Sequence, residues 1–166
     1  MSRSLLIIGA GGHGQVVAEV AVDCGYSEIA FIDDTSDRAI GKISEIEKFK
    51  EKYTDLFIGI GNNRLREQLF EWAEEMGFCI PILVHPTAYI SRTAVIEKGI
   101  IVEPMAIVNA RSVIRKGTIV SIGAVIDHDV EIGKYSHINA GAIIKAGTEI
   151  DDYTKIDAGE VGGNGR

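Results

Sequence analysis

Residues 114–144 read IRKGTIVSIGAVIDHDVEIGKYSHINAGAII, and within this stretch an isoleucine or valine returns at every sixth position. A period of six fits neither an α-helix, whose period is 3.6, nor an ordinary β-strand, whose period is 2. The frame extends in both directions and contains twelve β-branched positions: Ile90, Ile96, Val102, Val108, Ile114, Val120, Ile126, Ile132, Ile138, Ile144, Ile150 and Ile156. Four residues after most of them stands a small residue: Ala94, Ala106, Ser112, Thr118, Ala124, Ser136, Ala142, Thr148 and Thr154.

This hexad frame predicts a solenoid. Each hexad would form a short, flat strand and a turn, with the β-branched residue pointing inward and the small residue at the corner. Three hexads complete one triangular coil of eighteen residues, so twelve hexads predict four coils. We therefore expect residues 85–166 to form an all-β domain, a parallel β-helix.

The first half of the chain alternates segments of strand character and helix character, which indicates an α/β domain with a parallel sheet. Its size corresponds to about half of a doubly wound nucleotide-binding fold, a half-Rossmann domain. We place the domain boundary at His85-Pro86, so this domain covers residues 1–84. The expected strands are 5–10, 29–34, 55–60 and 78–84, and the expected helices are 15–23 and 62–76.

A glycine loop, Gly9-Ala10-Gly11-Gly12-His13-Gly14, follows the first strand and precedes the first helix. Such a loop lets the backbone approach a diphosphate at a helix N-terminus, and an acidic residue at the end of the next strand binds a ribose hydroxyl. Asp33 has that position, nineteen residues after Gly14. A full dinucleotide fold needs two such units, so the half-sized domain favours a nucleotide sugar over NAD. A tight turn without a ligand remains the third interpretation.

The carboxyl ends of parallel strands meet at one edge of the sheet, where ligands bind. We therefore expect one substrate-binding site made from the glycine loop and from the ends of the second and third strands. Its residues would be Gly11, Gly12, His13, Gly14, Asp33, Asp34, Gly61 and Asn62. Arg66, one turn into the following helix, is either a phosphate contact or a solvated surface residue.

His128 stands between Asp127 and Asp129 within the repeat. A carboxylate beside an imidazole fixes one tautomer and raises its basicity, as a general base for acyl transfer requires. His137 lies nine residues further on, half a coil away, so the two histidines share a site only where neighbouring chains meet. Two histidines are fewer than the three ligands of a catalytic metal site, and we expect no metal.

Charge and hydropathy exclude several classes of protein. The net charge is −7, so no excess of lysine and arginine is available to neutralise the phosphates of a nucleic acid. No apolar run is long enough to cross a bilayer, and the first residues run directly into a strand without a signal peptide's apolar segment. We expect a cytoplasmic protein with no membrane insertion.

With these motifs in place, the chain resembles the bacterial hexapeptide-repeat sugar O/N-acetyltransferases. That group includes UDP-4-amino-sugar N-acetyltransferases, perosamine N-acetyltransferases and sialic acid O-acetyltransferases. The motifs that carry the resemblance are the glycine loop, Phe31–Asp34, Ile60–Asn63, Asp127–Asp129 and Ile132–Ile138. The resemblance implies a left-handed β-helix, a homotrimer, acetyl-CoA as co-substrate, and acetylation of the amino group of a nucleotide-linked amino-deoxy sugar in bacterial surface glycan biosynthesis.

The resemblance also implies roles for individual residues. The histidine matching His128 accepts the proton, and the acid matching Asp129 increases its basicity. The residues matching His137 and Ala158 contact or adjoin acetyl-CoA. In members of the group, the nucleotide sugar is surrounded by the residues that match His13, Gly14, Gln15, Asp33, Asp34 and Gly61.

The hexad pattern stops at Val161, whereas members of the group usually continue for several hexads. The rungs that face coenzyme A are therefore expected to be partly missing. Three alternatives stay open: a sialic acid or related sugar O-acetyltransferase, a truncated nucleotide-sugar-binding protein with weak activity, and an NAD-dependent enzyme.

Overall fold

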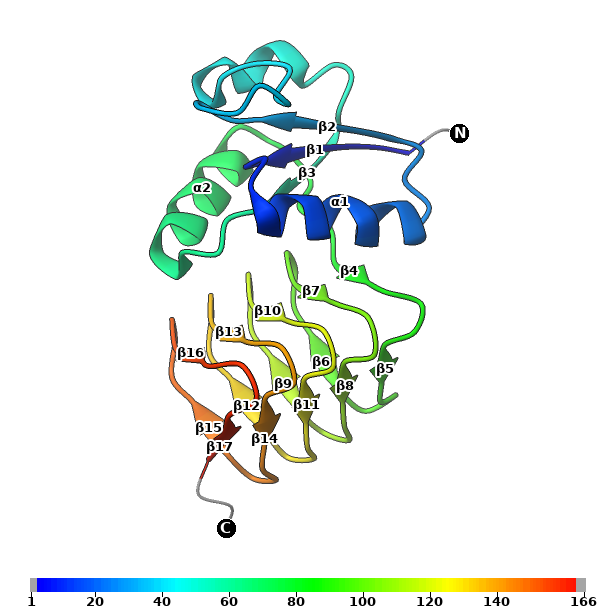
Figure 1. Cartoon of the computed structure of the whole chain (residues 1–166), viewed down its shortest axis with the longest axis vertical. Coiled ribbons are helices and arrows are strands. Elements are labelled where there is room, and N and C mark those ends of the chain that lie inside the picture. Colours follow the sequence, from blue (N-terminus) through cyan, green and yellow to red (C-terminus); the bar gives the residue numbers. More distant parts are fainter. Residues whose placement is uncertain (1–2, 164–166) are drawn as a thin grey trace. The chain divides into compact units, whose positions relative to one another are not determined.

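The computed structural model describes residues 3–163, and the chain divides into two compact units, Met1–Pro81 and Ile82–Arg166. The division falls three residues before the predicted boundary. Each unit is described by itself below (Figure 1). None of the helices within residues 3–163 is long and apolar enough to span a bilayer.

The first unit is built on a three-stranded parallel sheet with the order β2-β1-β3. The strands are β1 (Ser4–Ile8), β2 (Glu28–Ile32) and β3 (Asp55–Ile58), and the helices are α1 (Gly12–Asp23), α2 (Asn63–Glu75) and the short 3-10 helix η1 (Ile43–Phe49). Leu5 to Ile8 of the central strand are completely buried, as the continuous apolar run predicts. Helix α1 begins at Gly12, inside the glycine loop and three residues before its expected start.

The prediction of a fourth strand of this sheet at residues 78–84 is wrong. Cys79 makes a single parallel bridge to Asp55, and the following Leu83–Val84 pair with Ile101–Val102 of the second unit. The physical reason is that the hexad frame continues back to Val84, eighteen residues before Val102. Leu83 and Val84 therefore belong to the solenoid, and the boundary between the two units lies before them, between Pro81 and Ile82.

The second unit is a parallel β-solenoid whose strands are two residues long (Figure 1). Face 1 consists of β4 (Leu83–Val84), β7 (Ile101–Val102), β10 (Ile119–Val120), β13 (His137–Ile138) and β16 (Lys155–Ile156). Face 2 consists of β5 (Tyr89–Ile90), β8 (Ile107–Val108), β11 (Val125–Ile126), β14 (Ile143–Ile144) and β17 (Val161–Gly162). Face 3 consists of β6 (Val95–Ile96), β9 (Val113–Ile114), β12 (Glu131–Ile132) and β15 (Glu149–Ile150).

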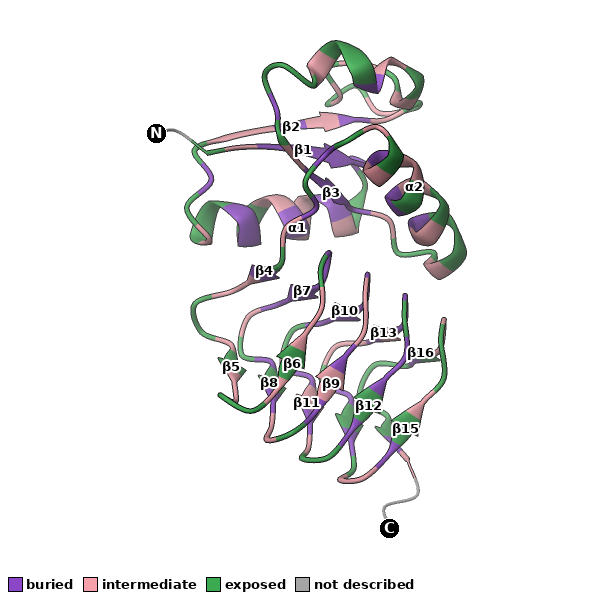
Figure 2. Cartoon of the chain, turned by 180° about the vertical axis from the view of Figure 1, so that it is seen from behind, coloured by how far each residue is buried: buried purple, intermediate pink, exposed green. Residues whose placement is uncertain are grey.

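The register confirms the predicted eighteen-residue coil. Val120, for example, lies beside Val102 on one side and Ile138 on the other. The β-branched residues of the frame form one core, in which Ile114, Ile126 and Ile132 are completely buried. Figure 2 shows buried segments recurring from coil to coil of the solenoid. Complete burial of such a side chain contributes roughly 1.5–3 kcal/mol.

The corners of the solenoid use small residues and left-handed backbone. The hydroxyl groups of Ser112, Thr118 and Ser136 are buried and donate to carbonyl oxygens fifteen residues ahead, at 2.6, 3.1 and 3.0 Å. Every sixth residue from Gly99 to Gly159 has a positive φ. Glycine adopts this conformation without a steric penalty, but five of the corners use another residue: Met105, Arg111, Asp129, Tyr135 and Tyr153.

Candidate active site

The corner between face 2 and face 3 carries His128 on residues 127–130, and its backbone is fixed by hydrogen bonds. Asp127 Oδ1 accepts from the backbone N–H of His128 at 2.7 Å. The N–H of Asp129 donates to the carbonyl of Ala110 on the preceding coil at 3.0 Å. The buried Ser112 hydroxyl accepts from the N–H of Val130 at 3.1 Å. The corner is therefore held on both sides of the histidine.

His128 and Asp129 form a side-chain pair in which Nδ1 of the imidazole lies 2.7 Å from Oδ2 of the carboxylate. An ionised carboxylate can only accept, so Nδ1 carries the proton and Nε2 of the neutral ring carries a lone pair. About half of the His128 side chain is exposed. The side-chain pair that the sequence indicates is therefore present, and the role of His128 as a general base stays a prediction.

Arg111 also contacts Asp129, a contact that the sequence analysis did not predict. Its Nε and Nη2 atoms lie 2.6 and 2.7 Å from the two carboxylate oxygens. This fork and the bond from His128 hold the pKa of the Asp129 carboxyl well below its usual range. The sequence signal was present, because positions 111 and 129 are eighteen residues apart and therefore stack on adjacent coils.

A hollow of about 340 Å³ opens beside the pair. It is lined by His128, Asp129, Ala146, Gly147 and Glu149, so its walls come from two successive coils. A base with an adjoining hollow is the arrangement that a general-base reaction on a small acceptor requires.

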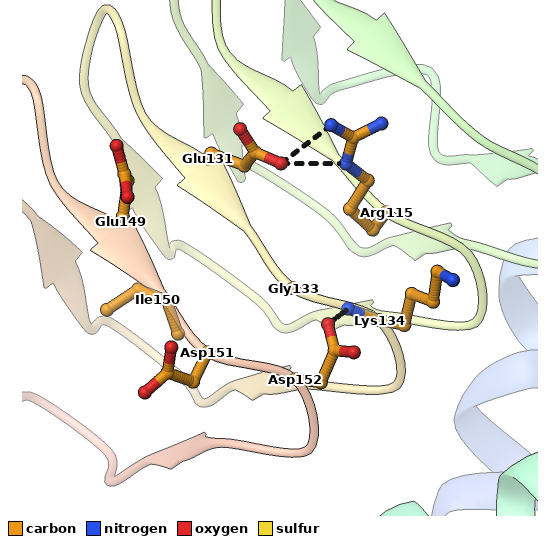
Figure 3. Close-up of a pocket in the computed structure, with 8 residues that line it drawn as sticks. All are labelled: Arg115, Glu131, Gly133, Lys134, Glu149, Ile150, Asp151 and Asp152. Atoms are coloured by element: carbon orange, nitrogen blue, oxygen red, sulfur yellow. Dashed lines mark hydrogen bonds and ion pairs between the residues drawn. The ribbon is translucent and has the colours of Figure 1, made fainter.

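A second hollow, of about 650 Å³, lies along face 3 and shares Glu149 with the first (Figure 3). Arg115 there donates to Glu131 at 2.6 and 2.9 Å and to Glu97 on the other side at 3.0 Å. The carboxylates outnumber the cations in its lining, which disfavours an anionic ligand. The lining residues are Arg115, Glu131, Gly133, Lys134, Glu149, Ile150, Asp151 and Asp152.

The residues expected to contact acetyl-CoA lie elsewhere on the solenoid. His137 is on β13 of face 1, the face opposite the corner that carries His128. Its Nε2 atom lies 3.0 Å from the Ser121 hydroxyl of the preceding coil. Ala158 is exposed, at the corner between face 1 and face 2. Within one chain, His137 thus lies across the solenoid from His128, whereas Ala158 lies at a corner that shares face 2 with the His128 corner.

In the first unit, the three expected loops do meet at the carboxyl edge of the sheet. Ala10 of the glycine loop donates from its N–H to Asp33 Oδ2 at 2.9 Å. The N–H of Gly59, after β3, donates to the carbonyl of Ile8 at 2.8 Å. The predicted clustering of the ends of β1, β2 and β3 is therefore present.

The glycines of the loop have different tasks. Gly14 is buried, and a Cβ there would overlap the carbonyl of Gly9, so this glycine permits close packing of helix against strand. Gly11 and Gly12 are exposed and have open space where a side chain would stand. His13 and Gln15 lie next to them, and Nε2 of the Gln15 side chain donates to the Ala10 carbonyl at 3.4 Å.

Several polar groups of the expected site are engaged in holding the loops. Asp33 Oδ1 accepts from the N–H groups of Thr35 and Ser36, at 2.8 and 3.0 Å. Asp34 Oδ1 accepts from the N–H of Ile43 at 3.0 Å, and Asn62 caps α2 by accepting from the N–H of Leu65 at 3.0 Å. A hollow of about 320 Å³ beside Asp33 is lined by residues of the segment after β2: Ser36, Asp37, Ala39, Ile40, Gly41, Lys42 and Glu45.

The interpretation of Arg66 as a solvated surface residue is wrong. The side chain is buried and donates to the carbonyls of Ile60 and Gly61 at 3.0 and 3.3 Å, and to Asn63 Oδ1 at 2.8 Å. These bonds hold the turn that follows β3, and a phosphate contact by Arg66 stays a prediction. Within residues 3–163, no cluster of three or more histidine, cysteine or carboxylate side chains is arranged to hold a metal ion.

The structure combines a hexapeptide-repeat solenoid, a His128–Asp129 pair at one of its corners, and an α/β unit that precedes the solenoid in the chain. The profile of the PglD N-terminal domain family matches residues 4–73. The chain is 30% identical to UDP-N-acetylbacillosamine N-acetyltransferase of Bacillus subtilis (strain 168), in an alignment of 118 positions that covers 60% of this chain and 50% of that protein. The chain therefore spans about half the length of this curated relative.

Solved structures match nearly the whole chain. The acetyltransferase domain of PglB from Neisseria gonorrhoeae FA1090 is 33% identical to this chain with a TM-score of 0.76, and the match covers 95% of this chain and 90% of that one. A second structure of the same PglB domain contains acetyl coenzyme A. PerB from Caulobacter crescentus, in complex with CoA and GDP-perosamine, is 27% identical with a TM-score of 0.77, covering 94% and 86%. The chain belongs to the family of bacterial hexapeptide-repeat sugar O/N-acetyltransferases.

Proposed function

We propose that this protein transfers the acetyl group of acetyl-CoA to the amino group of a nucleotide-linked amino-deoxy sugar used in bacterial surface glycan biosynthesis. The observation that carries the proposal is the His128–Asp129 pair beside the hollow at the corner of the solenoid. The relatives support the acceptor class, because their names specify amino sugars and PerB binds CoA together with GDP-perosamine.

In this reaction, the sugar amine attacks the thioester carbonyl while Nε2 of His128 takes a proton from the nitrogen. The new C–N bond forms, the C–S bond breaks, and the imidazolium returns its proton to the leaving thiolate of coenzyme A. Asp129 keeps the imidazole in the required tautomer and stabilises the imidazolium. The reaction needs no covalent enzyme intermediate.

The nucleotide part of the acceptor binds at the carboxyl edge of the first unit's sheet. The exposed backbone of Gly11 and Gly12 at the start of α1 suits a diphosphate, with His13 and Gln15 alongside. Asp33, Asp34, Gly61 and Asn62 belong to the same edge and hold its loops in shape. Gly14 contributes by allowing α1 to start so close to β1.

The active site is shared between copies of the chain in a homotrimer. His137, which is expected to bind acetyl-CoA, lies on the face opposite the His128 corner, so a neighbouring chain supplies one of the two histidines to each site. Face 2 supports this association, because it carries a column of apolar residues with one residue on each strand. The members are Tyr89, Ile107, Val125, Ile143 and Val161, of which Tyr89 and Val161 are more than half exposed.

The first experiment measures release of the coenzyme A thiol from acetyl-CoA with UDP-4-amino sugars, GDP-perosamine and CMP-sialic acid. We expect turnover with an amino sugar, a loss of roughly 10³-fold in kcat for His128→Gln, and no comparable loss for the control His85→Gln. Turnover with CMP-sialic acid alone would make the protein an O-acetyltransferase. Binding of UDP-sugars without turnover would make it a nucleotide-sugar-binding protein. Preferential binding of NAD would make the glycine loop a dinucleotide-binding loop and favour the NAD-dependent enzyme.

Complementation tests the shared site. His128→Gln and His137→Gln variants are unfolded together, refolded as a mixture and assayed beside each variant alone. In mixed trimers, an intact His128 of one chain meets an intact His137 of its neighbour, so activity returns. The trimeric state of the mixtures is verified by light scattering. If verified trimers recover no activity, no site combines His128 of one chain with His137 of its neighbour.

We place the reaction in the cytoplasm, where acetyl-CoA and nucleotide-activated sugars are available together. Fractionation of cells expressing the protein tests this location, with the protein expected in the fraction that also contains the acetyl-CoA pool.

A further inference from the structure

We propose that Arg111 is a positioning residue of the acetyl-transfer site, which holds the Asp129 carboxylate in the orientation that binds His128. The inference rests on the proposed function, and it goes beyond it by adding a third residue from a different coil to the base.

The geometry is that of a clamp. The Arg111 guanidinium grips both oxygens of Asp129, at 2.6 and 2.7 Å. Oδ2 of the same carboxylate lies 2.7 Å from Nδ1 of His128. The arginine therefore fixes the plane of the carboxylate as well as its position, because a planar fork matches a carboxylate in one orientation. Without it, Asp129 would be free to rotate about its side-chain bonds and release the imidazole.

The backbone explains why the clamp is available at this corner. Arg111 and Asp129 are eighteen residues apart, and they occupy equivalent corner positions with φ of 59° and 58°. Left-handed backbone is unfavourable for both residues, and glycine occupies most of the other corners. Each side chain thus stands where glycine would relieve strain, and the eighteen-residue register of β8 and β11 brings the arginine beside the acid of the next coil.

The contribution of the pair to stability does not explain its presence. The Arg111 and Asp129 side chains are 64% and 43% exposed, and ion pairs in such surroundings contribute little to folding. Arg111 can still orient His128 through Asp129, because a misplaced base lowers the rate of acetyl transfer even when the stability of the fold is unchanged.

Arg111 also sets the charge around the base. Asp127 and Asp129 flank His128 at its own corner, and Arg111 of the preceding coil contacts Asp129. On the following coil, Glu149 lines the same hollow, and Lys145 directly follows the strand that pairs with β11. Arg111 neutralises the carboxylate that touches the imidazole.

The test compares Arg111→Met, Arg111→Lys and a matched control, Arg115→Met. Arg115 also bridges carboxylates of successive coils, but its partners are Glu97 and Glu131 on face 3. Methionine keeps most of the unbranched stem in both variants, and lysine keeps the charge of Arg111 while losing the fork. NMR identifies which nitrogen of the neutral His128 imidazole carries the proton, with the signal assigned from its absence in His128→Gln, and kcat and KM are measured.

We expect Arg111→Met to lose the preference for a proton on Nδ1 of His128, because the Asp129 carboxylate is no longer held against that atom. We expect kcat to fall roughly 10-fold, with KM for both substrates unchanged. Arg111→Lys keeps the charge without the fork and should restore neither property, and Arg115→Met should change neither.

A wild-type imidazole signal and a wild-type kcat in Arg111→Met would overturn the proposal. A raised KM for acetyl-CoA with an unchanged imidazole signal would also overturn it, since Arg111 would then be a substrate contact. The NMR measurement does not depend on turnover, so it still reports the coupling of Arg111 to His128 if the wild-type protein transfers no acetyl group and the proposed function fails.

Discussion

The Asp33 carboxylate accepts a hydrogen bond from the backbone N–H of Ala10 at 2.9 Å, which joins the loop after β2 to the glycine loop after β1. This bond, followed by bonds from Thr35 and Ser36, lowers the pKa of Asp33 from 3.8 to about 2. The acid expected to bind a ribose hydroxyl is therefore already a link between two loops of the site.

We predict that Asp33→Asn destabilises the protein by roughly 1–2 kcal/mol at neutral pH, after allowance for partial solvent screening. Because the folded-state pKa is lowered, this contribution is present above about pH 4 and is lost as the pH falls through about 2. Urea unfolding of wild type and variant across this range measures it. Asp37→Asn, an exposed acid of the same loop, is the control. A difference that stays constant from pH 6 to pH 2 would contradict this account.

Arg66 provides a second prediction, because it is a buried cation whose described partners are carbonyl and amide oxygens. Arg66→Met leaves the carbonyls of Ile60 and Gly61 without this donor, which costs roughly 1–3 kcal/mol. The control is Arg64→Met on the same helix, whose side chain is 67% exposed. Chemical unfolding should separate the two variants. Equal stabilities, with weaker UDP-sugar binding in Arg66→Met, would instead support a phosphate contact by Arg66.

The fold was predictable from the sequence because its signals are local and repeated. The hexad frame specifies inward residues, corners and coil length at once, and the eighteen-residue register follows from it. The error at Leu83–Val84 arose because two apolar residues satisfy either an α/β strand or a solenoid strand. Only their position in the frame, six residues before Ile90, distinguishes the two.

The candidate site was predictable where adjacent residues form it, as in the His128–Asp129 pair. It was less predictable where partners come from other coils or loops. The Arg111 clamp depends on stacking of corners, and the engagement of Asp33 and Arg66 depends on backbone groups that have no sequence signature. Residue type indicates what a side chain can bind, whereas tertiary structure decides whether the backbone binds it first.

Met105 tests the cost of left-handed corners. It has φ of 60° and is 69% exposed, so its side chain makes little compensating contact. We predict that Met105→Gly stabilises the protein by roughly 0.5 kcal/mol, the difference between the left-handed strain and the flexibility of glycine. Met105→Ala keeps the strain and should not stabilise. Thermal unfolding of the three proteins measures the effect, and a gain from alanine equal to that from glycine would refute it.

Gly117 and Gly123 separate backbone strain from packing. Both have left-handed backbone, with φ of 68° and 64°. A Cβ at Gly123 meets open space, whereas a Cβ at Gly117 overlaps the ring of Tyr135. That ring is buried and stacks on Tyr153 of the next coil, with ring centres 6.1 Å apart, so it has little room to move.

We therefore predict that Gly123→Ala costs roughly 1–2 kcal/mol through backbone strain alone. Gly117→Ala should cost a further 1–3 kcal/mol or so through overpacking. In a Tyr135→Ala background the ring is gone, and the cost of Gly117→Ala should fall to that of Gly123→Ala. Denaturant unfolding of this double-mutant cycle gives the coupling directly. Additive effects of Gly117→Ala and Tyr135→Ala would mean that the coil relaxes around the new side chain, and that stacking of the two tyrosines does not fix the corner.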